Sequence, residues 1–496
     1  MNIQPLIQND FYKQSHYRQY PNNTTKVYSN VTARKSRIEG LNSIVVFGFQ
    51  YFIKAYLIEE WKRNFFDKPW QEVESKYLRT INNTLGPNAV TTTHIKKLHD
   101  LGYLPLSIKA LPEGVSVPIR VPCLTITNTV DHAYWLVNYL ESILSCITWQ
   151  PITSATIAKE FRRVLNKYAL ETVGNTDFCQ WQGHDFSFRG MSSLESACTS
   201  GAAHLLSFTG TDTIPVIEFL EQYYNADVTK ELIGASVPAS EHSVMCFGGK
   251  EDEIKTFDRL LDLFPEGILS VVSDTWSLPN VVCDLLPRLK DKIQNRKGKL
   301  VIRPDSFWTD PVDCLCGFDG YHPQMEKLNE QEKLSIRKGL IESLWDIFGG
   351  TISNKGYKIL APCIGAIYGD SITIERAEKI CQRLKEKGFA SINSVYGIGS
   401  YTYQYNTRDT FGLAIKATYG VVENQPIEVF KDPVTDDGMK KSAKGLIKVE
   451  GTSGHYIYKD CVSIEEEQSG ELLEVFRDGK LLIDYSLCQI RNNINK

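Results

Sequence analysis

Residues 364–371 read Ile-Gly-Ala-Ile-Tyr-Gly-Asp-Ser, a short apolar run that stops at glycine and aspartate. Short apolar runs of this kind are typical of strands buried in a parallel sheet. Residues 268–272, 300–302 and 392–396 have the same layout, and each run ends in a polar or glycine-bearing cluster. The repeated pattern predicts parallel strands that carry polar groups at their carboxyl ends.

The ends of such segments recur along the middle of the chain at a regular spacing. The markers of these ends are Asp185, Asp212, Val237, Asp274, Arg303, Asp370 and Gly397, with successive separations of 27, 25, 37, 29, 67 and 27 residues. Most of these separations match one strand followed by one helix. They predict a (β/α) barrel, in which active sites gather at the carboxyl ends of the strands. An open doubly wound sheet is the alternative, because spacing does not show closure.

Helices and flanking segments complete the predicted organisation. Amphipathic spacing predicts helices over 332–348 and 373–387, before Gly349 and Gly388 respectively. The flanks mix strands with helices, and Asp478-Gly479 between two apolar runs predicts a β-hairpin. We therefore expect an α/β barrel over 179–398 and a discontinuous α+β domain formed by 1–178 and 399–496.

The composition excludes several classes of protein. With 42% hydrophobic and 23% charged residues and a net charge of −4, the chain should be folded, with no general attraction to nucleic acid or an anionic membrane. No segment has the layout of a signal peptide or the apolar length of a membrane span. The twelve cysteines are scattered without a CxxC pair, which predicts a reduced, cytoplasmic protein.

Three aspartates stand at the predicted strand ends: Asp274, Asp305 and Asp370. Short carboxylates can hold a hydrated magnesium ion or accept hydrogen bonds from sugar hydroxyls. A single aspartate at such a place is more often a helix cap or a turn former. Their recurrence at the same topological position favours a site for a phosphorylated sugar.

Glycine and cationic residues offer groups for phosphate. Gly397-Ile398-Gly399-Ser400 follows a predicted strand, and glycine there lets backbone N–H groups approach a phosphate closely. The segment matches neither the P-loop nor the full GxGxxG dinucleotide fingerprint. Arg408, Lys416 and Lys431 follow downstream and supply positive charge, although solvated surface charge is an equally ordinary reading.

Two further positions combine residue types that suit chemistry. Phe186 and Arg189 pair an aromatic face with a guanidinium, which suits a flat heteroaromatic substrate beside a phosphate. His242, after Glu241, could act as a general acid or base or accept a phosphoryl group. The alternatives without a function in chemistry are a buried phenylalanine, a surface arginine and a structural histidine.

Long matching segments then carry a resemblance to a known family. They are residues 10–17 (Asp-Phe-Tyr-Lys-Gln-Ser-His-Tyr), 184–190 (His-Asp-Phe-Ser-Phe-Arg-Gly), 210–213, 236–242, 271–274, 302–306, 369–370, 407–409 and 430–433. Together they resemble the nicotinamide phosphoribosyltransferases of the type II phosphoribosyltransferase superfamily, nearly end to end. The resemblance implies an irregular (β/α) barrel with a second, discontinuous α+β domain, and a homodimer with shared active sites.

The reaction that the resemblance implies joins nicotinamide to phosphoribosyl pyrophosphate. Its products are nicotinamide mononucleotide and pyrophosphate, magnesium takes part, and the product enters NAD salvage. ATP would phosphorylate His242 and so aid turnover. Departure of pyrophosphate leaves positive charge on the ribose, so such a reaction needs positioning, carboxylates near the sugar and cations on the leaving group.

The resemblance also assigns roles to individual residues. For the pyridine ring and its amide they are Phe186, Tyr12 of the partner subunit, Asp212 and Arg303. For the ribose they are Asp305 and Asp370, and Ser236 and Gly369 complete the substrate-binding set. For the 5′-phosphate they are Arg189, Gly399, Ser400 and Arg408 of the partner subunit. Those for pyrophosphate and magnesium are Asp274, Arg34, Lys416 and Lys431, with Asp305 as a second metal ligand.

Selectivity and departures from the family pattern set the remaining expectations. A carboxylate at Asp212 can accept the N–H of nicotinamide but repels nicotinate, which argues against the nearest rival, a nicotinate phosphoribosyltransferase. Ser400, Phe307 and Ser371 stand where glycine is usual. A non-catalytic metabolite-binding relative and a magnesium-dependent barrel lyase are the rivals from other classes. The first is opposed by the joint presence of Asp274, Arg303, Asp305, Asp370 and His242. No Schiff-base lysine or metal cluster supports the second.

Overall fold

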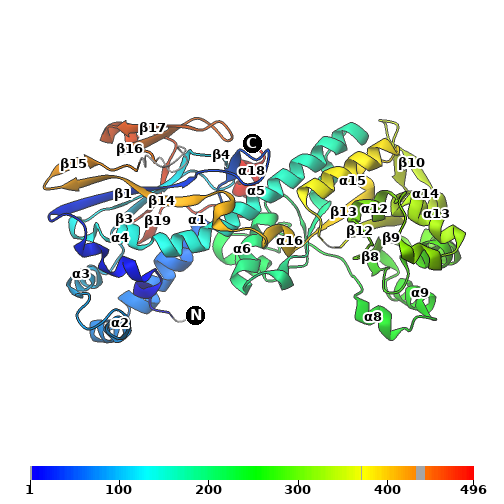
Figure 1. Cartoon of the computed structure of the whole chain (residues 1–496), viewed down its shortest axis with the longest axis horizontal. Helices are drawn as coiled ribbons and strands as arrows, with labels where there is room; N and C mark the ends of the chain where they lie inside the picture. The colour runs from blue at the N-terminus through cyan, green and yellow to red at the C-terminus, as the bar shows by residue number, and fades with distance from the viewer. Residues whose placement is uncertain (1–2, 370, 432–441) are drawn as a thin grey trace. The chain divides into compact units, whose positions relative to one another are not determined.

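The computed structural model describes residues 3–369, 371–431 and 442–496. The chain divides into two compact units (Figure 1). Unit 1 consists of residues 1–156, 218–229 and 406–496, and unit 2 of residues 157–217 and 230–405. Among the described residues, no helix is long and apolar enough to cross a membrane.

These units differ from the expected domain boundaries of 178/179 and 398/399. Residues 157–178 and 399–405 group with the barrel, and 218–229 group with unit 1. The second difference has a clear physical cause, because most of helix α7 (Val216–Tyr224) packs aromatic rings on unit 1. The ring of Phe219 lies 4.8 Å from that of Tyr51, and Tyr224 stacks on Phe47 at 5.0 Å.

Unit 2 contains six parallel strands in the order β7-β6-β13-β12-β9-β8. Their bounds are β6 (Gly183–Asp185), β7 (Gly210–Thr211), β8 (Glu266–Val272), β9 (Lys297–Arg303), β12 (Ile364–Tyr368) and β13 (Ser394–Ile398). The apolar run 364–368 forms β12, and its neighbours on both sides, β9 and β13, are predicted parallel strands. All four predicted strands are thereby confirmed, with ends shifted by a few residues in the other three.

A short segment closes this sheet into a barrel. Ala235 forms a parallel bridge with Gly210 of β7, and Ala239 forms one with Ser270 of β8. Backbone hydrogen bonds accompany both bridges: Thr211 N–H donates to Ala235 O at 3.0 Å, and Ser270 N–H donates to Pro238 O at 2.9 Å. The barrel therefore has seven positions that follow one another in chain order, and the open doubly wound sheet is excluded.

Helices lie along the outside of the barrel strands, as Figure 1 shows for α12, α14 and α15 beside β9 and β12. They are α6 (Leu194–His204), α9 (Glu253–Leu263), α11 (Leu286–Asn295), α12 (Pro311–Cys316), α13 (Glu330–Lys338), α14 (Leu340–Phe348) and α15 (Ile374–Glu386). The single helix predicted over 332–348 is wrong. Gly339, at φ 81°, breaks it into α13 and α14, and a Cβ there would lie 2.3 Å from Gly317 N.

Unit 1 is built on an antiparallel sheet in the order β15-β14-β1-β5-β3-β18-β19. The strands are β1 (Thr24–Ala33), β3 (Leu106–Ala110), β5 (Pro122–Asn128), β14 (Leu413–Val422), β15 (Gln425–Glu428), β18 (Leu473–Arg477) and β19 (Lys480–Leu481). Val31 of β1 pairs with Ile415 on one side and Leu124 on the other. The predicted hairpin at Asp478-Gly479 is confirmed, with both turn residues at positive φ.

Helical segments and small strands complete unit 1. They include α1 (Phe49–Tyr51), the π-helical segments η3 (Phe52–Glu60) and η4 (Lys62–Phe66), α2 (Trp70–Thr84), α3 (Thr93–Leu101), α4 (Leu136–Tyr139), the long α5 (Glu141–Thr172), which continues into unit 2, and α18 (Leu487–Ile494). Small strand pairs are β2 (Ser43–Val45) with β4 (Ser116–Pro118), and β16 (Leu446–Glu450) with β17 (Ile457–Val462).

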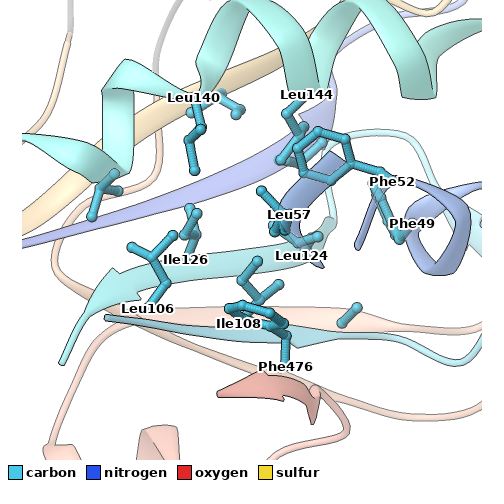
Figure 2. Packing of buried hydrophobic residues seen from close by; sticks show 14 of the residues in the cluster. Phe49, Phe52, Leu57, Leu106, Ile108, Leu124, Ile126, Leu140, Leu144 and Phe476 are labelled. Carbon is cyan, nitrogen blue, oxygen red and sulfur yellow. The ribbon is translucent and has the colours of Figure 1, made fainter. Parts of the chain in front are cut away.

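The core of unit 1 lies between its sheet and these helices. Figure 2 shows Leu106 and Ile108 of β3 beside Leu124 and Ile126 of β5, with Phe52 nearby. All five side chains are buried. Burying one such side chain contributes about 1.5–3 kcal/mol, so this alternation along β3 and β5 fixes which face of the sheet the helices cover.

Candidate active site

Polar side chains gather where the barrel strands end. Asp185 ends β6, Asp212 follows β7, Asp274 follows β8 and Arg303 ends β9. Because the strands are parallel and the barrel is closed, their carboxyl ends form one rim. These four sequence-based markers therefore lie on a common face of unit 2, and the contacts around them define a candidate active site.

Asp274 is bound by the loop that follows the neighbouring strand. Its Oδ2 atom accepts hydrogen bonds from Asp305 N–H at 3.0 Å, Ser306 N–H at 2.8 Å and Ser306 Oγ at 2.6 Å. Its other oxygen, Oδ1, is buried and accepts no hydrogen bond within the described part of the chain. His242 Nε2 lies 3.5 Å from that oxygen, and its side chain is 51% exposed.

Arg303, Asp305 and Gly369 form the adjacent part of the rim. Arg303 donates from Nη2 to Ser240 O at 2.7 Å, and its Nε lies 3.7 Å from Asp305 Oδ1. A Cβ atom at Gly369 would lie only 1.8 Å from that same Oδ1. Glycine is therefore required where β12 ends beside the carboxylate of Asp305. Asp370, the predicted ribose ligand, lies outside the described residues.

Asp212 is held by residues from two neighbouring barrel positions. Its Oδ1 accepts hydrogen bonds from His184 Nε2 at 2.8 Å and from Ser236 Oγ at 2.5 Å. Burial favours the neutral carboxyl, but these two hydrogen bonds and the positive charge of Arg303 outweigh it and lower the pKa of Asp212. Asp212 therefore carries a negative charge at neutral pH.

Phe186 lies next to His184, which binds Asp212. Its ring centroid is 4.6 Å from that of His184, and its N–H donates to Ile398 O of β13 at 3.0 Å. A Cβ atom at Gly397 would lie 2.7 Å from the Phe186 ring. The glycine of β13 thus makes room for this aromatic ring, which lies beside the carboxylate-binding histidine.

The predicted phosphate residues of unit 2 also come together. Arg189 and Gly190 belong to the short helix η7 (Phe188–Gly190), and Gly399 caps α16 (Ser400–Tyr403). A Cβ atom at Gly190 would lie 2.0 Å from Ser400 Oγ. Ser400 therefore packs directly against the turn that carries Arg189. Its side chain, at a position where glycine is usual, fits because residue 190 is itself glycine.

Ser371 and Phe307, the other departures from the expected pattern, also have a structural account. Ser371 has φ 53°, a left-handed conformation that glycine adopts more easily, and its carbonyl accepts a hydrogen bond from Arg376 at 2.6 Å. The ring of Phe307 stacks on that of Trp308 at 5.5 Å, and Trp308 stacks on His322 at 4.8 Å. An aromatic stack thus follows Ser306 directly.

Asp185 and His184 are residues whose importance sequence reasoning missed. Asp185 is fully buried and accepts hydrogen bonds from Ser187 N–H, Ser187 Oγ, Thr211 Oγ1 and Thr213 Oγ1. It ties the end of β6 to the loop after β7, which carries Asp212. The strand-end position of Asp185 was noticed in the sequence, but only the fold shows which hydroxyl groups its carboxylate binds.

Unit 1 contains a separate group of cations. Burial lowers the pKa of Lys416, and the positive charges of Arg34, Lys13 and Lys431 lower it further, while Glu141 opposes the change. Arg34 Nε donates to Gly412 O at 3.0 Å. The predicted pyrophosphate ligands Arg34 and Lys431 therefore lie within electrostatic reach of the third, Lys416, as does Lys13.

Tyr12 and Arg408, the predicted contributions of a partner subunit, also belong to unit 1. Tyr12 lies in the short helix η2 (Phe11–Arg18) and is 57% exposed. Arg408 begins the short helix η11 (Arg408–Thr410) and lies 3.3 Å from the carboxylate of Asp409. Both side chains are accessible to another molecule.

No group of three or more His, Cys, Asp or Glu side chains within the described ranges could hold a metal ion by itself. Magnesium often binds through one or two carboxylates together with water and substrate phosphates. The buried Oδ1 of Asp274, which accepts no hydrogen bond from the described residues, fits such a ligand. The rim of unit 2 thus combines an aromatic ring, a charged carboxylate beside it, and two further carboxylates at Asp274 and Asp305.

Comparisons with known proteins identify the family. The protein-family model described as "Nicotinate phosphoribosyltransferase (NAPRTase) family" matches residues 181–479. A second family model, "Nicotinamide phosphoribosyltransferase, N-terminal domain", matches residues 4–95. A protein of Acinetobacter baylyi named nicotinamide phosphoribosyltransferase is 48% identical over 99% of this chain and 97% of its own length. A protein of Mycoplasma pneumoniae with the same name is 37% identical over 88% and 93%.

Solved structures support the fold. A nicotinate-nucleotide pyrophosphorylase from Pyrococcus furiosus superposes with a TM-score of 0.56 at 14% identity, covering 99% of this chain and 95% of its own. Human nicotinic acid phosphoribosyltransferase gives a TM-score of 0.50 at 13% identity, covering 98% and 93%. The predicted irregular (β/α) barrel with a second, discontinuous α+β domain is confirmed.

Proposed function

This chain belongs to the nicotinate phosphoribosyltransferase (NAPRTase) family, and we propose that it joins nicotinamide to phosphoribosyl pyrophosphate. The chain is an enzyme, a pentosyltransferase. The products of the proposed reaction are nicotinamide mononucleotide and pyrophosphate. The bond between the ribose carbon and the pyrophosphate oxygen breaks, its electron pair leaves with pyrophosphate, and the pyridine nitrogen bonds to the same carbon.

The single observation that carries the choice of substrate is the charged carboxylate of Asp212. It lies beside the Phe186–His184 ring pair, where a pyridine ring could stack. A carboxylate accepts a hydrogen bond from the amide N–H of nicotinamide, whereas it repels the carboxylate of nicotinate. The relatives from Acinetobacter and Mycoplasma, which are named for the amide, support the same choice.

The rival is a nicotinate phosphoribosyltransferase, the activity for which the matching family model is named. The two activities share the same chemistry. They differ only in the substituent of the pyridine ring, amide or carboxylate, that faces residue 212. An acid-selective site needs a positive or neutral hydrogen-bond donor there. The hydrogen bonds from His184 and Ser236 and the charge of Arg303 instead stabilise the negative form of Asp212, which favours the amide.

Catalysis in this proposal comes from positioning and electrostatics. Positive charge develops on the ribose as pyrophosphate departs, and carboxylates near the sugar stabilise it. Asp305 and Asp370 are the proposed ribose ligands, with Arg303 holding Asp305 from one side. No nucleophilic side chain is required, because the pyridine nitrogen is itself the nucleophile.

Magnesium fits the carboxylates at the ends of β8 and β9. Asp274 and Asp305 would hold it, and the buried Oδ1 of Asp274 provides an oxygen that accepts no hydrogen bond from the described chain. When bound, the ion would neutralise charge on the pyrophosphate. The three hydrogen bonds to Oδ2 keep the carboxylate of Asp274 oriented, so Oδ1 remains available.

Phosphate groups have two proposed sets of ligands. Arg189, Gly399 and Ser400 would bind the 5′-phosphate, together with Arg408 of the partner subunit. Arg34, Lys416 and Lys431 would bind pyrophosphate. The proximity of Arg34 and Lys431 to Lys416 supports their role, because a bound polyanion stabilises like charges that otherwise repel.

We also infer that the enzyme is a homodimer in which Tyr12 of one subunit completes the pyridine site of the other. The exposure of Tyr12 supports this role. Mixing subunits tests it: Tyr12→Ala and Phe186→Ala proteins should each be weakly active, and subunit exchange should restore about a quarter of the sites, since random pairing yields some dimers with one intact site. A monomer by light scattering, or no recovery after demonstrated exchange, would contradict the dimer.

His242 is the proposed acceptor of a phosphoryl group. The γ-phosphoryl group of ATP would move to a ring nitrogen, its bond to ADP would break, and water would later release phosphate. The imidazole of His242 is half-exposed, and its Nε2 lies 3.5 Å from Asp274 Oδ1. This exposure supports access to the ring from solvent. His242→Ala should lose ATP-linked stimulation and the phosphorylated peptide seen by mass spectrometry, and should keep basal synthesis.

The decisive experiment compares two substrates. Purified protein with magnesium and phosphoribosyl pyrophosphate should convert nicotinamide with a kcat/KM at least about a hundredfold above that for nicotinate, the discrimination expected when a buried polar group is mispaired. Equal turnover of both, or turnover of nicotinate alone, would reject the assignment. A cytoplasmic location is part of the proposal, and it agrees with the absence of pairing among all twelve cysteines, each of which is described.

A further inference from the structure

His184 contacts both residues that are proposed to recognise the nicotinamide. Its Nε2 donates to Asp212 Oδ1 at 2.8 Å, and its ring lies 4.6 Å from the ring of Phe186. The side chain is only 13% exposed, so the ring is largely enclosed by its neighbours. None of the roles inferred from the sequence includes this residue.

The backbone around His184 leaves a defined space for its ring. His184 lies on β6 and pairs with Gly210 of β7. A Cβ atom at Gly210 would lie 2.7 Å from His184 Nδ1. The absence of a side chain at Gly210 therefore allows the imidazole to lie across β7 and reach Asp212, two residues further along.

The hydrogen bonds to Asp212 fall on one of its two oxygens. His184 and Ser236 both donate to Oδ1, and among the described residues no hydrogen bond to Oδ2 is found. Two donors on Oδ1 fix the plane of the carboxylate and leave Oδ2 as the acceptor for a ligand. Because a carboxylate accepts, Nε2 of His184 must carry its proton, which leaves Nδ1 unprotonated in the neutral ring.

We propose that His184 is a positioning residue that sets the preference for the amide over the acid, by orienting Asp212 and by supporting the ring of Phe186. The inference rests on the proposed function. Without the histidine, Asp212 keeps one hydrogen-bond donor, turns more freely and becomes easier to protonate. A protonated Asp212 can donate to a carboxylate, so the site would lose its discrimination against nicotinate.

The charges around Asp212 define the expected pH effect. The groups that face it are His184 of β6 and Arg303 of β9, both of which lower its pKa against the effect of burial. Asp185, also at the end of β6, is occupied by Ser187, Thr211 and Thr213. Removing the His184 hydrogen bond should therefore move the acidic limb of kcat/KM for nicotinamide to higher pH.

Two amide substitutions separate positioning from packing. The terminal nitrogen of glutamine occupies about the place of Nε2 in histidine, whereas that of asparagine occupies about the place of Nδ1. His184→Gln can thus still donate to Asp212, and His184→Asn cannot reach it. The matched control is His455→Asn, on an exposed turn of unit 1.

The measurement is the ratio of kcat/KM for nicotinamide to that for nicotinate, with the pH profile of each. His184→Asn should lower the ratio about tenfold or more, the effect of losing one hydrogen bond to a charged group, mainly through a higher KM for nicotinamide. His184→Gln should keep a ratio and an acidic limb close to those of the wild-type protein, and His455→Asn should change neither.

Several results would overturn the inference. An unchanged ratio and pH profile in His184→Asn, with the wild-type protein selective, would reject a positioning role. If His184→Asn does not fold, as judged by thermal unfolding, His184→Gln decides: a folded variant that has lost selectivity also contradicts the inference. A wild-type protein without amide selectivity would instead reject the proposed function.

Discussion

Ser306 donates both its backbone N–H and its hydroxyl group to Oδ2 of Asp274, at 2.8 and 2.6 Å. The loop after β9 thereby fixes a carboxylate that follows β8, and it does so through one oxygen only. Charge-assisted hydrogen bonds of this kind are about twice as strong as neutral ones. The orientation of Asp274 is thus set before any ligand arrives, which is what a preorganised electrostatic site requires.

Asp274→Asn should lower kcat/KM by about a hundredfold or more, the usual cost of removing one preorganised electrostatic group. Asparagine keeps an oxygen for Ser306 but replaces the other oxygen by NH₂, which cannot bind a cation. The rate should be measured against magnesium concentration. Asp284→Asn, in a surface ion pair with Arg288 at 3.0 Å, is the control, and equal losses in both variants would contradict a role in the site.

Gly397→Ala should raise the KM for nicotinamide about tenfold and destabilise the protein by about 1–3 kcal/mol, as overpacking does. The new Cβ would lie 2.7 Å from Phe186 Cδ2 and 2.8 Å from Gly369 O. Gly365→Ala on β12 is the control, because the atoms nearest to its Cβ would belong to the side chains of Lys299 and Val301, at 3.1 Å or more. Steady-state kinetics and thermal unfolding give both readouts.

Lys416→Met should weaken product inhibition by pyrophosphate about tenfold, which corresponds to about 1.4 kcal/mol for the lost charge. Without ligand the variant should be at least as stable as the wild-type protein, because Lys416 lies among the like charges of Arg34, Lys13 and Lys431. Lys448→Met, which removes an ion pair with Glu450 at 2.8 Å, should leave the inhibition constant unchanged.

Glu113→Gln should flatten the pH dependence of stability. Glu113 is 2% exposed, accepts a hydrogen bond from Gln50 N–H at 2.7 Å and has Tyr224 and Tyr485 nearby. Burial raises the pKa of Glu113 from 4.5 to about 7. Between these values the folded protein holds a proton that the unfolded chain has released, so the free energy of unfolding falls as pH rises.

The size of this effect for Glu113 is up to about 3 kcal/mol, and it should appear in denaturant unfolding at pH 5 and pH 8. Burial also raises the pKa of Glu253 to about 7, so Glu253→Gln should remove a second, independent part of the slope. Identical slopes in the wild-type protein and Glu113→Gln would show that Glu113 ionises normally in the folded state.

Much of the barrel could be predicted from the sequence, because buried parallel strands leave continuous apolar runs. Residues 364–368 are both the predicted and the observed strand. The run at 392–396 was misplaced by two residues, since Ser391–Asn393 form a short helix in which Asn393 accepts a hydrogen bond from Leu360 N–H. Such a long-range side-chain contact leaves no local signal.

The sequence predicted which residues belong to the site better than it predicted the contacts between them. Asp212, Phe186 and Asp274 could be singled out, but the hydrogen bond between His184 and Asp212 joins residues 28 positions apart and depends on the register of β6 and β7. The same holds for the assignment of residues 218–229 to unit 1, which depends on aromatic contacts with Phe47 and Tyr51. Pairings of this kind appear only once the fold is known.

The division of unit 1 into separated segments determines when the protein can finish folding during synthesis. The barrel unit is complete in the growing chain at Tyr405. At that moment β1 still lacks β14 and β3 still lacks β18. Both strands then present open edges, which invite association with other chains. A ribosome-bound intermediate of this enzyme should therefore need a chaperone at its amino-terminal sheet, and not at its barrel.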